Sequence, residues 1–167
     1  LKKLVFENHE ALTSAVRADV GGYKLRGLID FMGVVREADY ALSKLSSWTR
    51  PKRVPHDDGT PLNLLSRSEI RQEPKGVILI IGPWNYPVLL TLMPLVSAIA
   101  AGCCAVIKPS EVSENTTKVL APLITKYFDQ ACIRVVTGAV PETTALLTHR
   151  WDHIFYTGNG AVGRIVM

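Results

Sequence analysis

The chain has 167 residues, of which 47% are hydrophobic, and its formal net charge is +4 at neutral pH. This apolar content, with a mean hydropathy of +0.16, excludes a disordered chain and indicates one core-forming domain or a piece of a larger protein. Lysines and arginines are scattered, and the densest basic run, residues 50–53, is too short to predict a nucleic-acid partner.

Three cysteines, Cys103, Cys104 and Cys132, form an odd set without the spacing of a disulfide framework. No Cys or His pair has the spacing of metal ligands, so no metal site is predicted. In a strand, the adjacent Cys103 and Cys104 would point to opposite faces, and we interpret these two cysteines as small buried hydrophobic residues.

Apolar residues recur at helical spacing over residues 1–20 and again over residues 23–48, which predicts two long amphipathic helices. Residues 50–61 contain three prolines and an Asp-Asp-Gly sequence, which predict a loop or arm. An edge strand is expected within residues 62–73. We therefore expect a first unit, residues 1–61, made of the helices and the Pro-rich arm.

From residue 62 to residue 167, apolar runs alternate with amphipathic segments, and no hairpin signal separates them. We predict strands at residues 77–81, 104–107, 133–136 and 153–156, and helices at residues 89–101, 113–128, 141–148 and from 158 onward. Ser113 and Thr116 offer N-cap oxygens for the second of these helices. This order predicts an α/β fold, a parallel sheet with helices on both faces, preceded by the two long helices.

Residues 88–107 are about long enough to cross a membrane as one helix. Pro94 and Gly102 interrupt them, and small residues dilute their hydrophobicity. A helix followed by a strand fits better, so no membrane segment is predicted.

Polar and glycine-rich motifs follow each predicted strand of the sheet: residues 82–87, 108–111, Gly138 and residues 158–163. In such sheets ligands bind outside the carboxyl ends of the strands, which predicts a nucleotide site. Glycines at 158, 160 and 163 would let phosphate approach a helix N-terminus, although a tight strand–helix turn has the same pattern.

Lys108 and Glu111 form either a solvated salt pair or a site for ribose hydroxyls. A Glu at this place disfavours a 2′-phosphate by charge repulsion, which favours NAD over NADP. The Asn85 side chain offers a neutral N–H donor for an oxyanion, and its alternative role is that of a turn residue. By residue type alone, Trp84 would be a core residue.

Four sequence motifs come in the order seen in aldehyde dehydrogenases. They are Gly82-Pro83-Trp84-Asn85-Tyr86-Pro87, Lys108-Pro109-Ser110-Glu111, Val140-Pro141-Glu142-Thr143-Thr144 and Phe155-Tyr156-Thr157-Gly158. The Trp-Asn-Tyr-Pro and Val-Pro-Glu-Thr-Thr sequences resemble the class 3, fatty-aldehyde-type branch. The resemblance covers essentially the whole chain.

The resemblance implies that residues 62–167 form a Rossmann-like NAD(P)-binding domain, incomplete relative to the family's full fold. It makes Asn85 the oxyanion donor, and it places Trp84, Lys108 and Glu111 along the adenosine and Gly138 against the adenine. The turn near the pyrophosphate would comprise Gly158, Asn159, Gly160, Ala161, Val162 and Gly163. The family usually has Ser and Thr where this chain has Asn159 and Gly160, which puts the hydroxyl contacts of that turn in question.

The resemblance also implies oxidation of aldehydes, medium- or long-chain or aromatic, to carboxylic acids with NAD, or with NADP as the alternative. The family's mechanism needs a Cys thiolate and a general-base Glu, which we expect beyond residue 167. We expect the chain to be cut at both ends and inactive alone, the alternative being a natural short form that acts as a non-catalytic nucleotide-binding or scaffold module. For the full-length protein we expect a homodimer in the cytoplasm, with membrane association through a C-terminal tail as the alternative.

Overall fold

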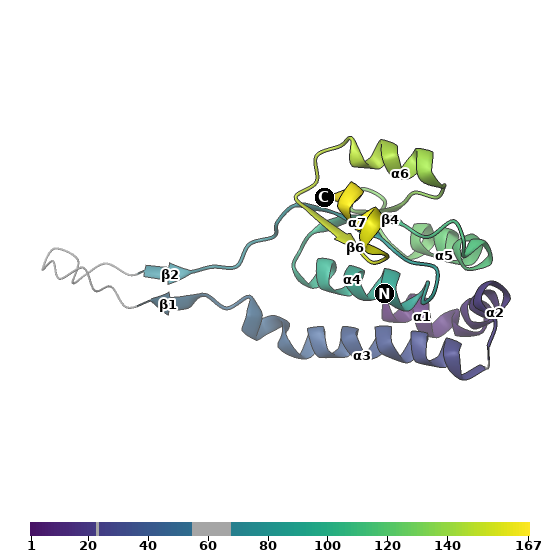
Figure 1. Cartoon of the computed structure of the whole chain (residues 1–167). Helices are drawn as coiled ribbons and strands as arrows, with labels where there is room; N and C mark the ends of the chain where they lie inside the picture. Colours follow the sequence, from purple (N-terminus) through teal and green to yellow (C-terminus); the bar gives the residue numbers. More distant parts are fainter. Residues whose placement is uncertain (23, 55–67) are drawn as a thin grey trace, which may run out of the picture.

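The computed structural model describes residues 1–22, 24–54 and 68–167 (Figure 1). The expected boundary between residues 61 and 62 therefore lies outside the described residues. The helices are α1 (Lys2–Glu7), α2 (His9–Val20), α3 (Lys24–Trp48), α4 (Leu89–Ala100), α5 (Glu114–Tyr127), α6 (Val140–Leu147) and α7 (Gly160–Val166). The strands are β1 (Lys52–Val54), β2 (Ser68–Ile70), β3 (Val77–Ile81), β4 (Cys104–Lys108), β5 (Ile133–Val135) and β6 (His153–Tyr156).

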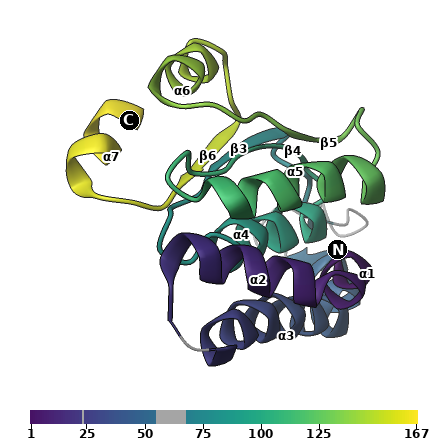
Figure 2. The same ribbon diagram turned by 90° about the vertical axis from the view of Figure 1, so that its right-hand side faces the viewer.

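Within the described residues, the main sheet has the strand order β5-β4-β3-β6, and every neighbouring pair is parallel. The chain runs outward from β3 to β5 and then crosses back to place β6 on the other side of β3. Helices α4 and α5 cover one face of the sheet, and α6 lies over the other face (Figure 2). The predicted α/β fold with a parallel sheet and helices on both faces is confirmed.

The hydrophobic core lies between the sheet and the layer formed by α4 and α5. Ile80 of β3 and Ile107 of β4 have no exposed surface, and neither do Leu92 of α4 and Leu120 of α5. Full burial of one such side chain contributes roughly 1.5–3 kcal/mol. Helices α2 and α3 form an outer layer on the same side of the sheet, with α3 packed along α4 (Figure 2).

The first predicted helix is wrong in one respect, because it breaks at Asn8 and gives the two helices α1 and α2. The Asn8 side-chain amide donates to the Leu4 carbonyl at 2.8 Å and to the Tyr127 hydroxyl of α5 at 3.1 Å. An amide side chain that bonds to backbone carbonyls competes with helix continuation. The contact that holds Asn8 in place comes from α5, far along the sequence.

Strands β1 and β2 pair antiparallel, with Arg53 opposite Glu69, and extend away from the body of the molecule (Figure 1). Strand β2 confirms the edge strand expected within residues 62–73. Most of the predicted Pro-rich arm lies outside the described residues.

Residues 88–107 contain α4 and all of β4 except its last residue, so a helix followed by a strand is present as predicted. Within the described ranges, no helix combines the length and apolar character that crossing a membrane requires.

The N-terminus of α5 is capped by a side chain from another helix. Ser113 occupies the N-cap position, but its hydroxyl donates to the Ser110 carbonyl, and the capping oxygens belong to Asp19 of α2. The Asp19 carboxylate accepts from the backbone N–H groups of Asn115 at 3.0 Å and Thr116 at 2.7 Å, and from both side chains. Burial raises the pKa of Asp19, but these hydrogen bonds outweigh it and hold the pKa below its ordinary value of 3.8.

We expect the substitution Asp19→Ala to lower the free energy of unfolding by about 1 kcal/mol at neutral pH, because α5 loses its cap. The folded-state pKa is lowered, so the contribution is fully present above pH 3.8 and is lost as the pH falls through the folded-state pKa. Urea unfolding at several pH values measures this difference. Glu10→Ala, at an exposed position of α2, is the matched control and should cost less than about 0.5 kcal/mol. Equal losses in both variants at neutral pH would contradict the capping role.

Candidate functional site

The parallel strands of the main sheet all end at one edge, where the motifs predicted from the sequence meet. The order of strands reverses at β3, because β4 lies on one side of it and β6 on the other. Ligands of open parallel sheets bind beside such a reversal, at the carboxyl ends of the strands.

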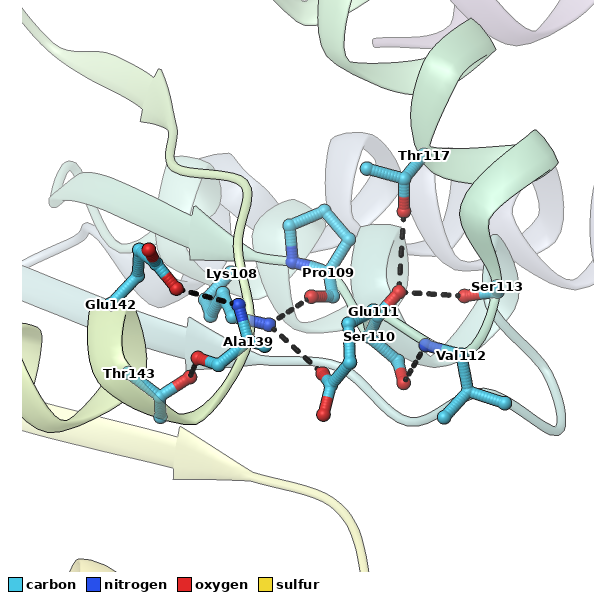
Figure 3. Close-up of polar contacts among 10 residues, drawn as sticks. All are labelled: Lys108, Pro109, Ser110, Glu111, Val112, Ser113, Thr117, Ala139, Glu142 and Thr143. Carbon is cyan, nitrogen blue, oxygen red and sulfur yellow. Dashed lines mark hydrogen bonds and ion pairs between the residues drawn. The ribbon is translucent and has the colours of Figure 1, made fainter.

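Lys108, the last residue of β4, is a buried cation whose side chain is only 2% exposed. Its ammonium donates to the Pro109 carbonyl and lies 3.3 Å from the Glu111 carboxylate, which is 47% exposed (Figure 3). The alternative of a solvated pair is therefore wrong for Lys108, although the pairing itself is correct. A buried ammonium requires a partner of opposite charge, so Glu111 is held at the surface by a fixed cation beneath it.

A second carboxylate in this region, that of Glu142, comes from α6 (Figure 3). It accepts from the Ala139 backbone N–H at 2.7 Å, and Thr143 donates its hydroxyl to the Ala139 carbonyl at 2.8 Å. The Ala139 hydrogen bond lowers the pKa of Glu142, followed by the bond from its own N–H, and the positive charge of Lys108 adds to the effect. Glu142 was not among the predicted site residues. The signal was present, because a Pro in the first helical turn and a Glu at the third helical position are typical of a helix start.

A groove of about 550 Å³ lies between the β4–α5 turn, the side of α5 and the β5–α6 turn. It brings together two predicted cofactor residues, Glu111 and Gly138, and Lys108 lies behind Glu111. Its volume is in the range of small-molecule sites. Gly138 has φ +139°, and a Cβ there would lie 2.4 Å from the Glu142 side chain. Any other residue would therefore strain the backbone and clash with Glu142.

Trp84 and Asn85 follow β3 in the turn that leads to α4. Trp84 is 52% exposed, so its interpretation as a core residue is wrong. The Asn85 side-chain oxygen accepts from the Tyr86 backbone N–H at 3.1 Å. This bond orients the Asn85 amide and agrees with both of its predicted roles, the turn residue and the oxyanion donor.

In the turn before α7, Gly158 and Gly160 have different surroundings. A Cβ on Gly158 would lie 2.1 Å from the Tyr156 hydroxyl, whereas the nearest atom to a Cβ on Gly160 is 4.0 Å away. Close packing against Tyr156 therefore explains why residue 158 is a glycine, as the tight-turn alternative predicts. The backbone at Gly160 has open space around it, so a ligand can approach it. Asn159 caps α7, because its side-chain oxygen accepts from the Val162 N–H at 2.9 Å.

The three cysteines lie at the opposite edge of the sheet. Cys104 is the first residue of β4, Cys132 directly precedes β5, and Cys103 is only 4% exposed. Asn85 follows the far end of β3, which is roughly 13 Å along the strand from the level of Cys104. None of the three thiols is therefore placed beside Asn85.

The parallel sheet, its reversal at β3 and the groove at its carboxyl edge define the class of Rossmann-like α/β domains. Sequence comparison agrees, because the model of the aldehyde dehydrogenase family matches residues 1–167. The chain belongs to the aldehyde dehydrogenase family.

Among its relatives, the chain is 46% identical to aldehyde dehydrogenase family 3 member B2 of Mus musculus and 44% identical to family 3 member B1 of Homo sapiens. Both alignments cover the whole chain but only 34% and 35% of the relatives, so the chain spans about a third of their length. A solved structure of the substrate-bound state of Staphylococcus aureus AldH superposes with a TM-score of 0.91 at 36% identity, covering 99% of this chain and 36% of that one. Betaine aldehyde dehydrogenase of the same organism, in complex with NAD+, superposes with a TM-score of 0.82 at 26% identity, covering 99% of this chain and 32% of that one.

The glycine at the groove gives a testable contrast. We expect Gly138→Ala to lower the free energy of unfolding by about 1–3 kcal/mol, because alanine is strained at this φ and displaces Glu142 from its hydrogen bond. Gly160→Ala is the matched control and should leave stability unchanged or slightly raised, because it adds a helix-favouring residue in open space. Thermal unfolding of both variants checks this, and equal midpoints would show that the Gly138 backbone is not constrained.

Proposed function

We propose that this chain forms the dinucleotide-binding region of an aldehyde dehydrogenase that oxidises aldehydes to carboxylic acids with NAD. The observation that carries the proposal is the groove between Glu111 and Gly138 at the carboxyl edge of the sheet, in a member of this family. The resemblance of the Trp-Asn-Tyr-Pro sequence to the class 3, fatty-aldehyde-type branch favours medium- or long-chain or aromatic aldehydes as substrates.

The residues at the groove fit a nucleoside. Glu111 presents a half-exposed carboxylate that is fixed by Lys108, and carboxylate oxygens accept hydrogen bonds from ribose hydroxyls. Gly138 lines the groove, so a base can lie against its backbone, and the exposed ring of Trp84 in the turn after β3 offers an apolar surface. We assign the pyrophosphate to the turn of residues 158–163, where Gly160 leaves the backbone open.

Charge at the groove favours NAD over NADP. Glu111 presents a half-exposed carboxylate at the groove, and the other charged residues that line it, Glu114 and Lys118, pair with each other at 2.7 Å. A 2′-phosphate brought against Glu111 would meet a like charge at close range.

Asn85 is the proposed donor to the oxyanion that forms when a nucleophile attacks the aldehyde carbon. A neutral amide N–H, oriented by the bond between its own oxygen and Tyr86, stabilises negative charge without a proton transfer. NAD, when bound, accepts the hydride in this reaction. We propose that the nucleophilic thiolate lies outside residues 1–167, since the three cysteines lie at the other edge of the sheet, and the family resemblance implies the same for the general-base Glu. A homodimer and a cytoplasmic location remain proposals that rest on the family resemblance.

For Glu111→Gln we expect the preference for NAD over NADP to narrow by roughly five- to tenfold, because a charge opposite the 2′-phosphate is removed. Equilibrium titration of the protein with each nucleotide measures the two dissociation constants. Glu10→Gln, which removes an exposed charge on α2, should leave their ratio unchanged. Failure of the unsubstituted protein to bind either nucleotide would overturn the proposed function itself.

For Asn85→Ala in the enzyme we expect kcat for aldehyde oxidation to fall by about 10²–10³-fold, with the dissociation constant of NAD unchanged. Steady-state kinetics and nucleotide titration provide the two readouts. A lowered melting temperature with little change in kcat would instead support the role of Asn85 as a turn residue.

A further inference from the structure

Two free thiols lie side by side at the amino edge of the sheet. The Sγ atoms of Cys104 and Cys132 are 2.9 Å apart. Cys104 begins β4, and Cys132 directly precedes β5, in a register that pairs Ala105 with Ile133. The Ala105 N–H also donates to the Cys132 carbonyl at 2.9 Å, so the backbones of the two strands are already joined at this level.

The pair is accessible, whereas the third cysteine is not. Cys104 and Cys132 are both partly exposed, but Cys103 is 4% exposed and its thiol faces the Ala101 carbonyl. Neighbouring strands are separated by roughly 4.8 Å, which lies within the Cα separations of roughly 4.4–6.8 Å that disulfides span. The spacing of the two strands is therefore compatible with a bond between the two sulfurs.

We propose that Cys104 and Cys132 form a redox modification site, which closes to an intramolecular disulfide on two-electron oxidation by hydrogen peroxide. One sulfur attacks the peroxide, the O–O bond breaks, and a sulfenic acid and one water form. The second thiol attacks that sulfenic sulfur, the S–S bond forms, and a second water leaves. The two thiols lose two electrons and two protons, and the peroxide is reduced to water. A dithiol reductant reverses the modification by thiol–disulfide exchange.

The bond would act on the weakest strand of the described sheet. β5 has three residues and pairs with β4 alone among the described strands, so few hydrogen bonds hold it. The two cysteines are 28 positions apart and enclose α5, so a disulfide restricts the unfolded chain over that whole segment. We expect the oxidised protein to unfold at a higher temperature than the reduced protein.

The test is treatment with hydrogen peroxide followed by alkylation and intact-mass measurement. We expect a loss of two hydrogens and one alkylated cysteine in place of three. Digestion with trypsin should then yield residues 76–118 linked to residues 127–134. Because the first peptide contains both Cys103 and Cys104, Cys103→Ala is the matched control and should retain the link.

Cys104→Ala and Cys132→Ala should both lose the link and the oxidation-dependent rise in melting temperature. That rise should persist in Cys103→Ala and disappear on treatment with dithiothreitol. The near-isosteric Cys104→Ser and Cys132→Ser repeat the test if an alanine variant fails to fold. A link that survives in the Cys104 variants, a disulfide formed only between two chains, or oxidation to sulfinic acid alone in the unsubstituted protein would overturn the proposal.

Discussion

The position of β3 at the centre of the parallel sheet is the constraint on which the rest of the structure depends. It is hydrogen-bonded to β4 on one side and to β6 on the other, and Leu79 and Ile80 have no exposed surface. Because all these strands run in one direction, the turns that follow them must meet at one edge. The groove, the Asn85 turn and the start of α7 are neighbours for this reason, although up to 75 residues separate them in sequence.

Local signals were enough to predict the sheet, because buried parallel strands are short apolar runs and glycines bound them. Contacts between distant residues were not predictable in the same way. The break at Asn8 depends on Tyr127, and the cap of α5 comes from Asp19, 96 positions before Asn115. The site shows the same division, because the pairing of Lys108 with Glu111 follows from their spacing, whereas the burial of Lys108 depends on packing across elements.

Burial of Lys108 links the stability of the chain to the chemistry of the groove. A buried ammonium costs free energy unless a carboxylate compensates it, and Glu111 is the ion-pair partner of Lys108 at 3.3 Å. Glu111 therefore has a structural role as well as the ligand-binding role that we propose. Its replacement by a neutral residue leaves Lys108 with less compensation, so changes in nucleotide preference at this position must be judged together with changes in stability.

β5 connects the two edges of the sheet. Its amino end begins next to Cys132, and after three residues the chain reaches the turn that contains Gly138. Val136 donates to the Ile107 carbonyl at 2.8 Å, so this turn is held to β4 by a bond one residue before Lys108. A disulfide at the amino end would restrain the same short strand that positions one wall of the groove. Oxidation at the thiols and ligand binding at the groove would then both favour the arrangement in which β5 is paired with β4. Because both processes favour the same arrangement, each would make the other more favourable.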